Sequence, residues 1–179
     1  MRRALSLAVT TLLLATALSG CSGISSIVSG SDSVEVPTWE VGDWWLYTFS
    51  TTDYTDDTAR LVVASVSEEG GTANMLGISS LTEARRHAVL NHNPFLGRMT
   101  HENLAAFENG VAQTVMDFPI EEDGTWSFTL FSIEWSADVR GISGNYVTMG
   151  ASSADGSKLD YVYDMDAQFF SSFIWTDSS

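Results

Sequence analysis

Apolar and polar residues alternate with the two-residue period of β-strands along most of the chain after residue 36. The clearest case is the run IEWSADVR at residues 133–140, in which every second residue is apolar, and residues 126–130 follow the same pattern. Turn signals such as Asn109-Gly110 recur at intervals of roughly 8–12 residues, which is typical of all-β domains. The pattern predicts roughly nine or ten antiparallel strands connected in sequence order as a meander.

The first of these strands, Val41–Phe49, carries apolar side chains on both of its faces. Trp45, Tyr47 and Phe49 share one face, and Trp44 and Leu46 share the other. A strand of this kind is typical of a sheet covered on both sides, so the sequence predicts that Trp44 is buried.

The residues at the start of this strand are partly repeated later in the chain. The pattern Pro37-x-x-Glu40-x-Gly42-x-Trp44 recurs 82 residues later, ending at Trp126, which we also expect to be buried. Each copy combines a rigid proline, a glycine suited to a tight turn and a tryptophan that leads a strand. Four matching positions leave both duplication and convergence on a common strand entry open.

One short stretch has helical rather than strand character. The segment Ser80-Leu81-Thr82-Glu83 is a capping box, and apolar residues follow it at helical spacing, which predicts a helix from Leu81 to about Leu90. The expected fold is therefore all-β with one short helix. We expect a strongly curved antiparallel sheet, a half-barrel around the helix like that of bacterial lipoprotein carriers; the alternative is a closed β-barrel.

Charge and cysteine content limit the range of functions. The chain of 179 residues has 23 acidic and 8 basic residues, for a formal net charge of −15. Because such a surface repels phosphates, nucleic acid is excluded as a partner. An acidic, lysine-poor surface suits a saline habitat as well as it suits an ordinary secreted protein. The single cysteine, Cys21, excludes a disulfide within the chain.

The N-terminus has the features of a targeting segment. Arg2 and Arg3 precede an apolar run at residues 4–18, which is short for a membrane-spanning helix. The run ends in Leu18-Ser19-Gly20-Cys21, which resembles the lipobox of bacterial and archaeal lipoproteins. The resemblance implies that residues 1–20 are a signal peptide and that a diacylglyceryl group is attached to Cys21. The mature protein would then be anchored to the outer face of the cytoplasmic membrane.

From Cys21 onward the chain has two regions of different composition. Residues 21–35 are rich in serine and glycine, which predicts a flexible tether. Residues 36–179 hold the strand patterns and form the single predicted domain.

Residue patterns that would indicate catalysis or metal binding are weak. His87 and His92 are five residues apart, where helical ligand pairs are spaced by three or four, and His101 stands apart from both. Aspartates gather at residues 53–57 and 155–166 without the regular spacing of a calcium loop, which favours solvated turns. There is no G-x-S-x-G motif and no glycine-rich phosphate loop. The sequence predicts a protein that is not an enzyme and that holds no metal or cofactor.

The aromatic residues are the remaining candidates for function, because the chain has six Trp, nine Phe and five Tyr. They either fill the core of the sheet or line a groove for an apolar ligand or a partner protein. The candidate residues are Trp44, Trp45, Tyr47, Trp126, Trp135 and Trp175.

The opening VPTWEVGDWWLYTF resembles the P-x-W-x-V-G-D-x-W-x-Y entry of a group of uncharacterised secreted archaeal lipoproteins, and the later segments FPIEEDGTWSF and YVYDMDAQFF fit the same group. The resemblance implies an extracytoplasmic all-β protein of archaeal type, and it transfers no catalytic residue. Two functions fit. One is a tethered binding module for an apolar ligand or an envelope protein. The other is a structural cell-surface protein without a small-molecule ligand.

Overall fold

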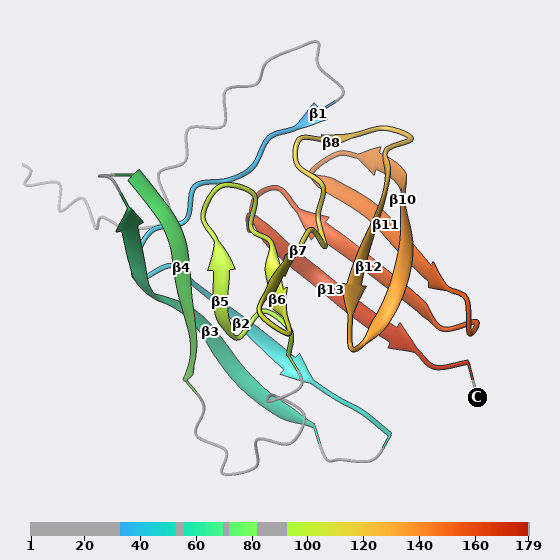
Figure 1. The fold of residues 1–179 in the computed structure, drawn as a ribbon, viewed down its shortest axis with the longest axis horizontal. Helices are drawn as coiled ribbons and strands as arrows, with labels where there is room; N and C mark the ends of the chain where they lie inside the picture. The colour runs from blue at the N-terminus through green and yellow to red at the C-terminus, as the bar shows by residue number, and fades with distance from the viewer. Residues whose placement is uncertain (1–32, 53–55, 70–71, 82–92, 179) are drawn as a thin grey trace, which may run out of the picture. The chain divides into compact units, whose positions relative to one another are not determined.

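The computed structural model describes residues 33–52, 56–69, 72–81 and 93–178, and within these ranges the chain forms strands and turns but no helix (Figure 1). The first strands are β1 (Ser33–Val34), β2 (Trp44–Phe49), β3 (Asp57–Glu69), β4 (Thr72–Leu81), β5 (Gly97–Thr100), β6 (Ala106–Glu108) and β7 (Val111–Gln113). The later strands are β8 (Ile120–Glu121), β9 (Thr125–Leu130), β10 (Ile133–Ser143), β11 (Tyr146–Ser153), β12 (Lys158–Asp164) and β13 (Phe169–Thr176).

The strands form two larger sheets and one small one. The six-stranded sheet has the order β2-β3-β4-β5-β6-β7, and the five-stranded sheet has the order β13-β12-β11-β10-β9. All neighbours in these two sheets are antiparallel and follow one another in sequence, so the predicted meander is confirmed. Both sheets are open in the described part of the chain, which agrees with a curved sheet; the alternative of a closed barrel is wrong.

Two predicted boundaries differ from the structure. Ser33 and Val34 fall in the predicted tether, yet they form β1 and pair with Glu121 and Ile120 of β8. Leu81, predicted to begin a helix, is the last residue of β4, where it pairs with Arg60. The rest of the predicted helix, residues 82–90, lies outside the described residues, as do residues 1–32.

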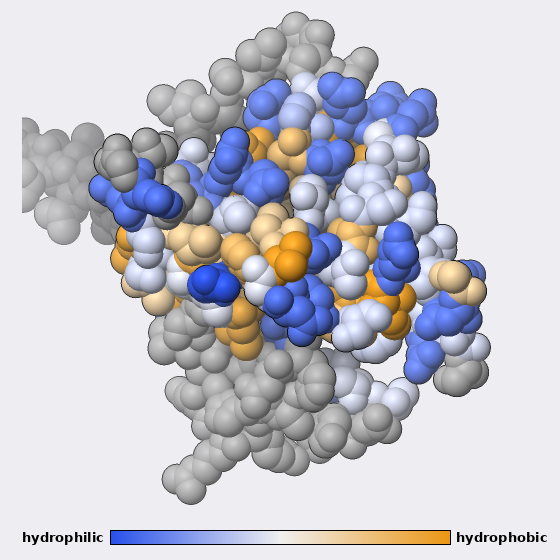
Figure 2. All heavy atoms as spheres, in the orientation of Figure 1, coloured by the Kyte–Doolittle hydropathy of each residue, from blue (hydrophilic) through white to orange (hydrophobic). Residues whose placement is uncertain are grey.

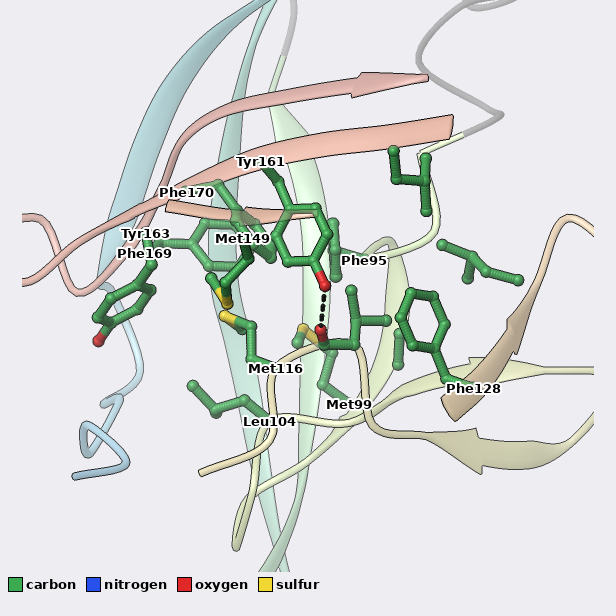
Figure 3. Close-up of a cluster of buried hydrophobic side chains, with 14 of the residues drawn as sticks. Phe95, Met99, Leu104, Met116, Phe128, Met149, Tyr161, Tyr163, Phe169 and Phe170 are labelled. Atoms are coloured by element: carbon green, nitrogen blue, oxygen red, sulfur yellow. Dashed lines mark hydrogen bonds between the residues drawn. The ribbon is translucent and has the colours of Figure 1, made fainter. Parts of the chain in front are cut away.

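The core is built from the inward-facing residues of both sheets, as the alternation predicts. The hydroxyl of Tyr161 on β12 donates a hydrogen bond to the backbone oxygen of Val115, at 3.1 Å, and so satisfies the polar atom of a ring that is 1% exposed (Figure 3). The largest fully buried side chains are Trp39, Leu61, Leu76, Met99, Leu104, Met116, Ile120, Trp135, Tyr161, Tyr163 and Phe169.

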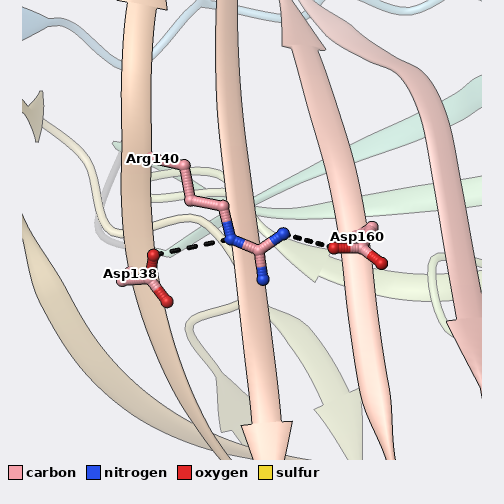
Figure 4. Close-up of polar contacts among 3 residues, drawn as sticks. All are labelled: Asp138, Arg140 and Asp160. Carbon is pink, nitrogen blue, oxygen red and sulfur yellow. Dashed lines mark hydrogen bonds and ion pairs between the residues drawn. The ribbon is translucent and has the colours of Figure 1, made fainter.

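The outer face of the five-stranded sheet carries an ion-pair group. Arg140 on β10 lies between Asp138 on its own strand and Asp160 on β12 (Figure 4). To reach β12 its side chain crosses β11 at Gly150, where the Cβ of any other residue would collide with the guanidinium. Glycine is therefore required at this position for the crossing. All three side chains are about half exposed, so the pairs contribute little to stability.

Candidate interaction surface

Three aromatic side chains near the start of the six-stranded sheet donate hydrogen bonds to the backbone of residues 167–170. Trp39 Nε1 lies 3.1 Å from the oxygen of Gln168, and Trp45 Nε1 lies 2.7 Å from that of Ala167. The hydroxyl of Tyr47 lies 2.7 Å from the oxygen of Phe170. These bonds join β2 and the segment before it to the start of β13 and the turn before it; β2 and β13 are edge strands with no ladder between them.

The rings of these residues pack on one another and on β13. The ring centroids of Trp39 and Trp45 are 4.5 Å apart, those of Trp39 and Phe169 are 4.9 Å apart, and Phe95 lies 5.0 Å from Phe170. Burial, with a smaller contribution from the negative charge of Asp164, raises the pKa of Tyr47 far above its usual value. The described aromatics on the inner faces therefore fill the space between the sheets themselves, so Trp45 and Tyr47 serve as core residues.

The other interior candidates also have packing roles. Trp135 is fully buried, and its Nε1 donates to the oxygen of Leu130 at 2.9 Å. Trp126 is half-buried, and its buried Nε1 has no hydrogen-bond partner in the described structure. Trp175 is 45% exposed and stacks on Phe131 with centroids 4.7 Å apart, near the end of β13.

Trp44 contradicts its prediction. It is 53% exposed, and Leu46, on the same face of β2, is 60% exposed. Exposure alternates along β2, so Trp45, Tyr47 and Phe49 point inward while Trp44 and Leu46 point outward. Among the described residues the strand is covered on one face only, and Trp44 and Leu46 are exposed on the other.

The matching turns before β2 and β9 explain why the sequence repeat misplaced Trp44. In the first turn the Asp43 amide donates to the Glu40 oxygen at 3.1 Å, and in the second the Gly124 amide donates to the Glu121 oxygen at 3.1 Å. The third turn residue has a positive φ in both cases, +103° at Gly42 and +62° at Asp123. The equivalence is therefore 81 residues, not 82.

In this register the two glycines of the motif occupy different turn positions, and glycine is needed at each position for a different reason. Gly42 supplies the positive φ. Gly124 comes one place later, where a Cβ would lie 3.1 Å from the Glu121 oxygen and 3.5 Å from Val139. With an offset of 81, Trp126 corresponds to Trp45 and Thr125 corresponds to Trp44.

Trp44 and Leu46 belong to a surface that we call the outer patch, which consists of Trp44, Leu46, Arg60 and Val62. Trp44 pairs with Val62 across the ladder, and Leu46 pairs with Arg60. The guanidinium carbon of Arg60 lies 4.2 Å from the centroid of the Trp44 ring, a cation–π contact. Thr48 and Thr58 continue the same face, so the six outward positions where β2 and β3 pair carry no carboxylate.

The outer surface of the five-stranded sheet carries more charged residues. Its outward positions include four carboxylates, namely Glu134, Asp138, Asp160 and Asp164, and two cations, Arg140 and Lys158. On the face visible in Figure 2, hydrophilic residues gather over β8 and the neighbouring strand ends, and hydrophobic residues are interspersed over β4 to β7. The outer patch is thus an apolar and cationic surface in a strongly acidic chain.

The aspartates at residues 155–166, one of the two clusters considered as calcium ligands, make separate local contacts; in the other cluster, Asp53 lies outside the described residues. Hydrogen bonds from Ser153 and Ser157 lower the pKa of Asp155. Asp160 pairs with Arg140, Asp164 accepts the amides of the following turn, and Asp166 accepts the amide of Asn145 at 2.7 Å. Within the described ranges no group of three or more His, Cys, Asp or Glu side chains is arranged to hold a metal ion.

Two sets of candidate residues lie outside the described ranges. The lipobox residues Leu18, Ser19, Gly20 and Cys21 are one set, and His87 and His92 are the other. In the part of the chain that the structure describes, no helix is long and apolar enough to cross a membrane. Comparison of the chain with protein-family models, curated proteins and solved structures found no match.

Sequence reasoning missed two participants. Trp39 was not among the candidates, although it is 2% exposed and links the start of the six-stranded sheet to the turn before β13. Arg60 was not among the candidates either, because its position over Trp44 depends on the register of β2 against β3. The available signal was local: Arg60 is the only charged residue in the run RLVVASV.

Proposed function

We propose that this protein is a lipid-anchored, extracytoplasmic binding module without enzymatic activity, held at the outer face of the cytoplasmic membrane through Cys21. The support is the positively charged start, the apolar run at residues 4–18 and the Leu18–Cys21 box, which ends in the only cysteine of the chain. A diacylglyceryl group carries two chains, and two chains give stable anchoring where one does not.

The observation that carries the binding role is the exposed outer patch. An outward-facing Trp and Leu pair contributes nothing to the core, and apolar exposure of this kind marks interaction sites. The interior, in contrast, is occupied by aromatic rings in mutual contact, which disfavours an apolar ligand held between the sheets. The partner in this proposal is therefore an envelope component that contacts the surface of the domain.

A structural cell-surface protein is the second candidate function. The dense aromatic packing between the sheets favours it, because a static scaffold needs stability and no opening. The two candidates differ in the outer patch, which a scaffold without partners does not require.

The anchor is tested by expressing the full chain and a Cys21→Ser variant and separating membrane from soluble fractions. We expect the parent in the membrane fraction, with an intact mass that shows loss of residues 1–20 and gain of a lipid, and the variant in the soluble fraction. Ser22→Ala is the matched control, because it alters the neighbouring residue and leaves the box intact. Equal membrane retention of Cys21→Ser and the parent would contradict the proposal.

A further inference from the structure

We propose that the outer patch docks on the membrane surface to which the lipid at Cys21 holds the chain, so that the domain contacts lipid headgroups through β2 and β3. This inference rests on the proposed function, because it needs the anchor to bring the domain to the membrane. It names the envelope component as the lipid surface itself.

The chemistry of the outer patch suits the boundary between headgroups and acyl chains. Tryptophan is enriched at this boundary, because its ring is apolar and its N–H reaches polar groups. Leu46 and Val62 add aliphatic surface on either side of Arg60, whose guanidinium suits lipid phosphates. Three of the four members thus favour the acyl boundary and the fourth favours the anionic headgroup.

Local charge favours the outer patch over the outer face of the five-stranded sheet. The chain has a formal net charge of −15, so anionic headgroups repel most of its surface. Repulsion is screened over about 10 Å at moderate ionic strength, so the charges on the approaching face decide the orientation. The six outward positions where β2 and β3 pair carry one cation and no carboxylate, and Glu68 and Glu69 lie beyond this paired part of β3. The outward positions of the five-stranded sheet carry four carboxylates and two cations, Arg140 and Lys158.

The length of chain between the anchor and the patch permits the contact. Residues 22–32 separate Cys21 from Ser33 and span at most about 40 Å when fully extended. Ser33 and Trp44 are eleven residues apart, so their separation cannot exceed about 40 Å on any path. A tether of this length holds the domain near the membrane at an effective concentration of order mM, at which even a weak contact is occupied.

The second strand entry shows that a strand with the same turn forms without apolar outward residues. In the offset of 81 residues, Thr125 takes the place of Trp44 and Ser127 takes the place of Leu46. Both strands form the same turn and the same kind of antiparallel pair with these different outward residues. The apolar pair on β2 is thus an addition to a strand that β9 builds with polar residues.

The test uses the full, lipidated chain with one new cysteine, because lipidation consumes the thiol of Cys21 and leaves the new thiol as the single labelling site. Leu46→Cys places it in the outer patch. Ile174→Cys is the matched control, an aliphatic residue 55% exposed on edge strand β13 of the other sheet. Each protein is labelled with an environment-sensitive fluorophore and reconstituted into phosphatidylcholine–phosphatidylglycerol vesicles. Quenching by a nitroxide-bearing lipid and by aqueous iodide is then measured.

We expect the nitroxide lipid to quench the label at position 46 several-fold more than the label at position 174, and iodide to do the reverse. Adding Trp44→Thr to Leu46→Cys should bring the quenching at position 46 down to the control level without lowering the unfolding midpoint. That variant separates docking from folding.

Three results would overturn the inference in different ways. Equal iodide access at both positions in membrane-bound protein would refute docking and leave the anchor standing. Shielding of position 46 from both quenchers, relieved by diluting the protein in the vesicles, would assign the patch to a second copy of the chain. Recovery of the protein in the aqueous phase with two free thiols would refute the proposed function, and docking with it.

Discussion

Strands β2 and β9 begin with the same turn and then differ in what they show to the outside. Both follow a four-residue turn with a positive φ at its third residue, and both place an inward tryptophan at the start of the strand, Trp45 or Trp126. On the opposite face β2 carries Trp44 and Leu46, where β9 carries Thr125 and Ser127. The inward residues of both strands pack in the core, whereas the outward residues are available for a contact with a partner.

The partners of the two inward tryptophans also differ. Trp45 donates its indole hydrogen to the backbone of Ala167, 122 residues away. Trp126 packs at an equivalent place, yet its Nε1 has no hydrogen-bond partner among the residues described. The tryptophan on β2 thus links the edges of the two sheets by a hydrogen bond, whereas the tryptophan on β9 contributes packing alone.

The largest expected effect contrasts the inner and outer tryptophans. Trp135→Ala removes a fully buried ring that sits opposite Phe128 of β9, and should lower the free energy of unfolding by about 3–5 kcal/mol. Trp44→Ala removes a ring that is half in solvent, and should change it by less than about 1 kcal/mol. Urea unfolding measures both, and equal losses would refute the assignment of faces.

The next expected effect appears at alkaline pH. Burial raises the pKa values of Tyr47, Tyr161 and Tyr163 far above the usual value near 10, so these phenols ionise in the unfolded chain first. The folded state then holds more protons above pH 10, and stability, complete below that pH, falls as pH rises. Each tyrosine should contribute at most about 1.4 kcal/mol per pH unit to the fall in the free energy of unfolding.

Tyr47→Phe tests this, because it installs on β2 the residue that β9 has at the equivalent position, Phe128. The variant should lose one tyrosine's share of the alkaline slope. It should also lose about 1 kcal/mol at neutral pH with the hydrogen bond to Phe170. Phenolate absorbance and circular dichroism measure the alkaline transition. If the free energy of unfolding fell as steeply with pH as in the parent, this would contradict the burial of Tyr47.

A smaller effect separates the two inward tryptophans. Trp45→Phe leaves the oxygen of Ala167 without its indole donor and should cost about 1 kcal/mol beyond the change in packing. Trp126→Phe removes an N–H that makes no hydrogen bond in the described structure, so this cost is absent. Parallel thermal unfolding of both variants measures the difference, and a larger loss for Trp126→Phe would reverse the assignment.

The smallest expected effect on stability belongs to the double variant Trp44→Thr with Leu46→Ser, which gives β2 the outer residues of β9. Its free energy of unfolding should stay within about 0.5 kcal/mol of the parent, because both side chains are exposed. Chemical denaturation measures this change. A loss of several times that size would mean that the outer patch supports the fold, and would remove the case for a surface contact.

The sequence predicted the class and connectivity of the fold because alternation and turn signals act locally. Residues 133–139 alternate in the structure as they do in the sequence, and consecutive strands pair as the short turns require. The predicted helix after Leu81 falls mostly outside the described residues.

The wrong prediction for Trp44 shows what a local sequence pattern does not determine. Apolar residues on both faces of a strand do not reveal whether a second layer covers the outer face, because that depends on chain far away in sequence. The offset of 82 aligned two glycines that serve different turn positions, Gly42 for its φ and Gly124 for its lack of a Cβ. The contact between Arg60 and Trp44 needed the register of β2 against β3, which periodicity does not specify.

The hydrogen bonds from Trp39, Trp45 and Tyr47 to residues 167–170 have a consequence for biosynthesis. They span 129, 122 and 123 positions of the chain, so their donors are made long before their acceptors. A ribosome or export channel that has released the chain only as far as β12 has delivered the donors and none of the acceptors. The two sheet edges therefore join only after residues 167–170 have emerged, and a chain truncated before residue 167 lacks these three hydrogen bonds.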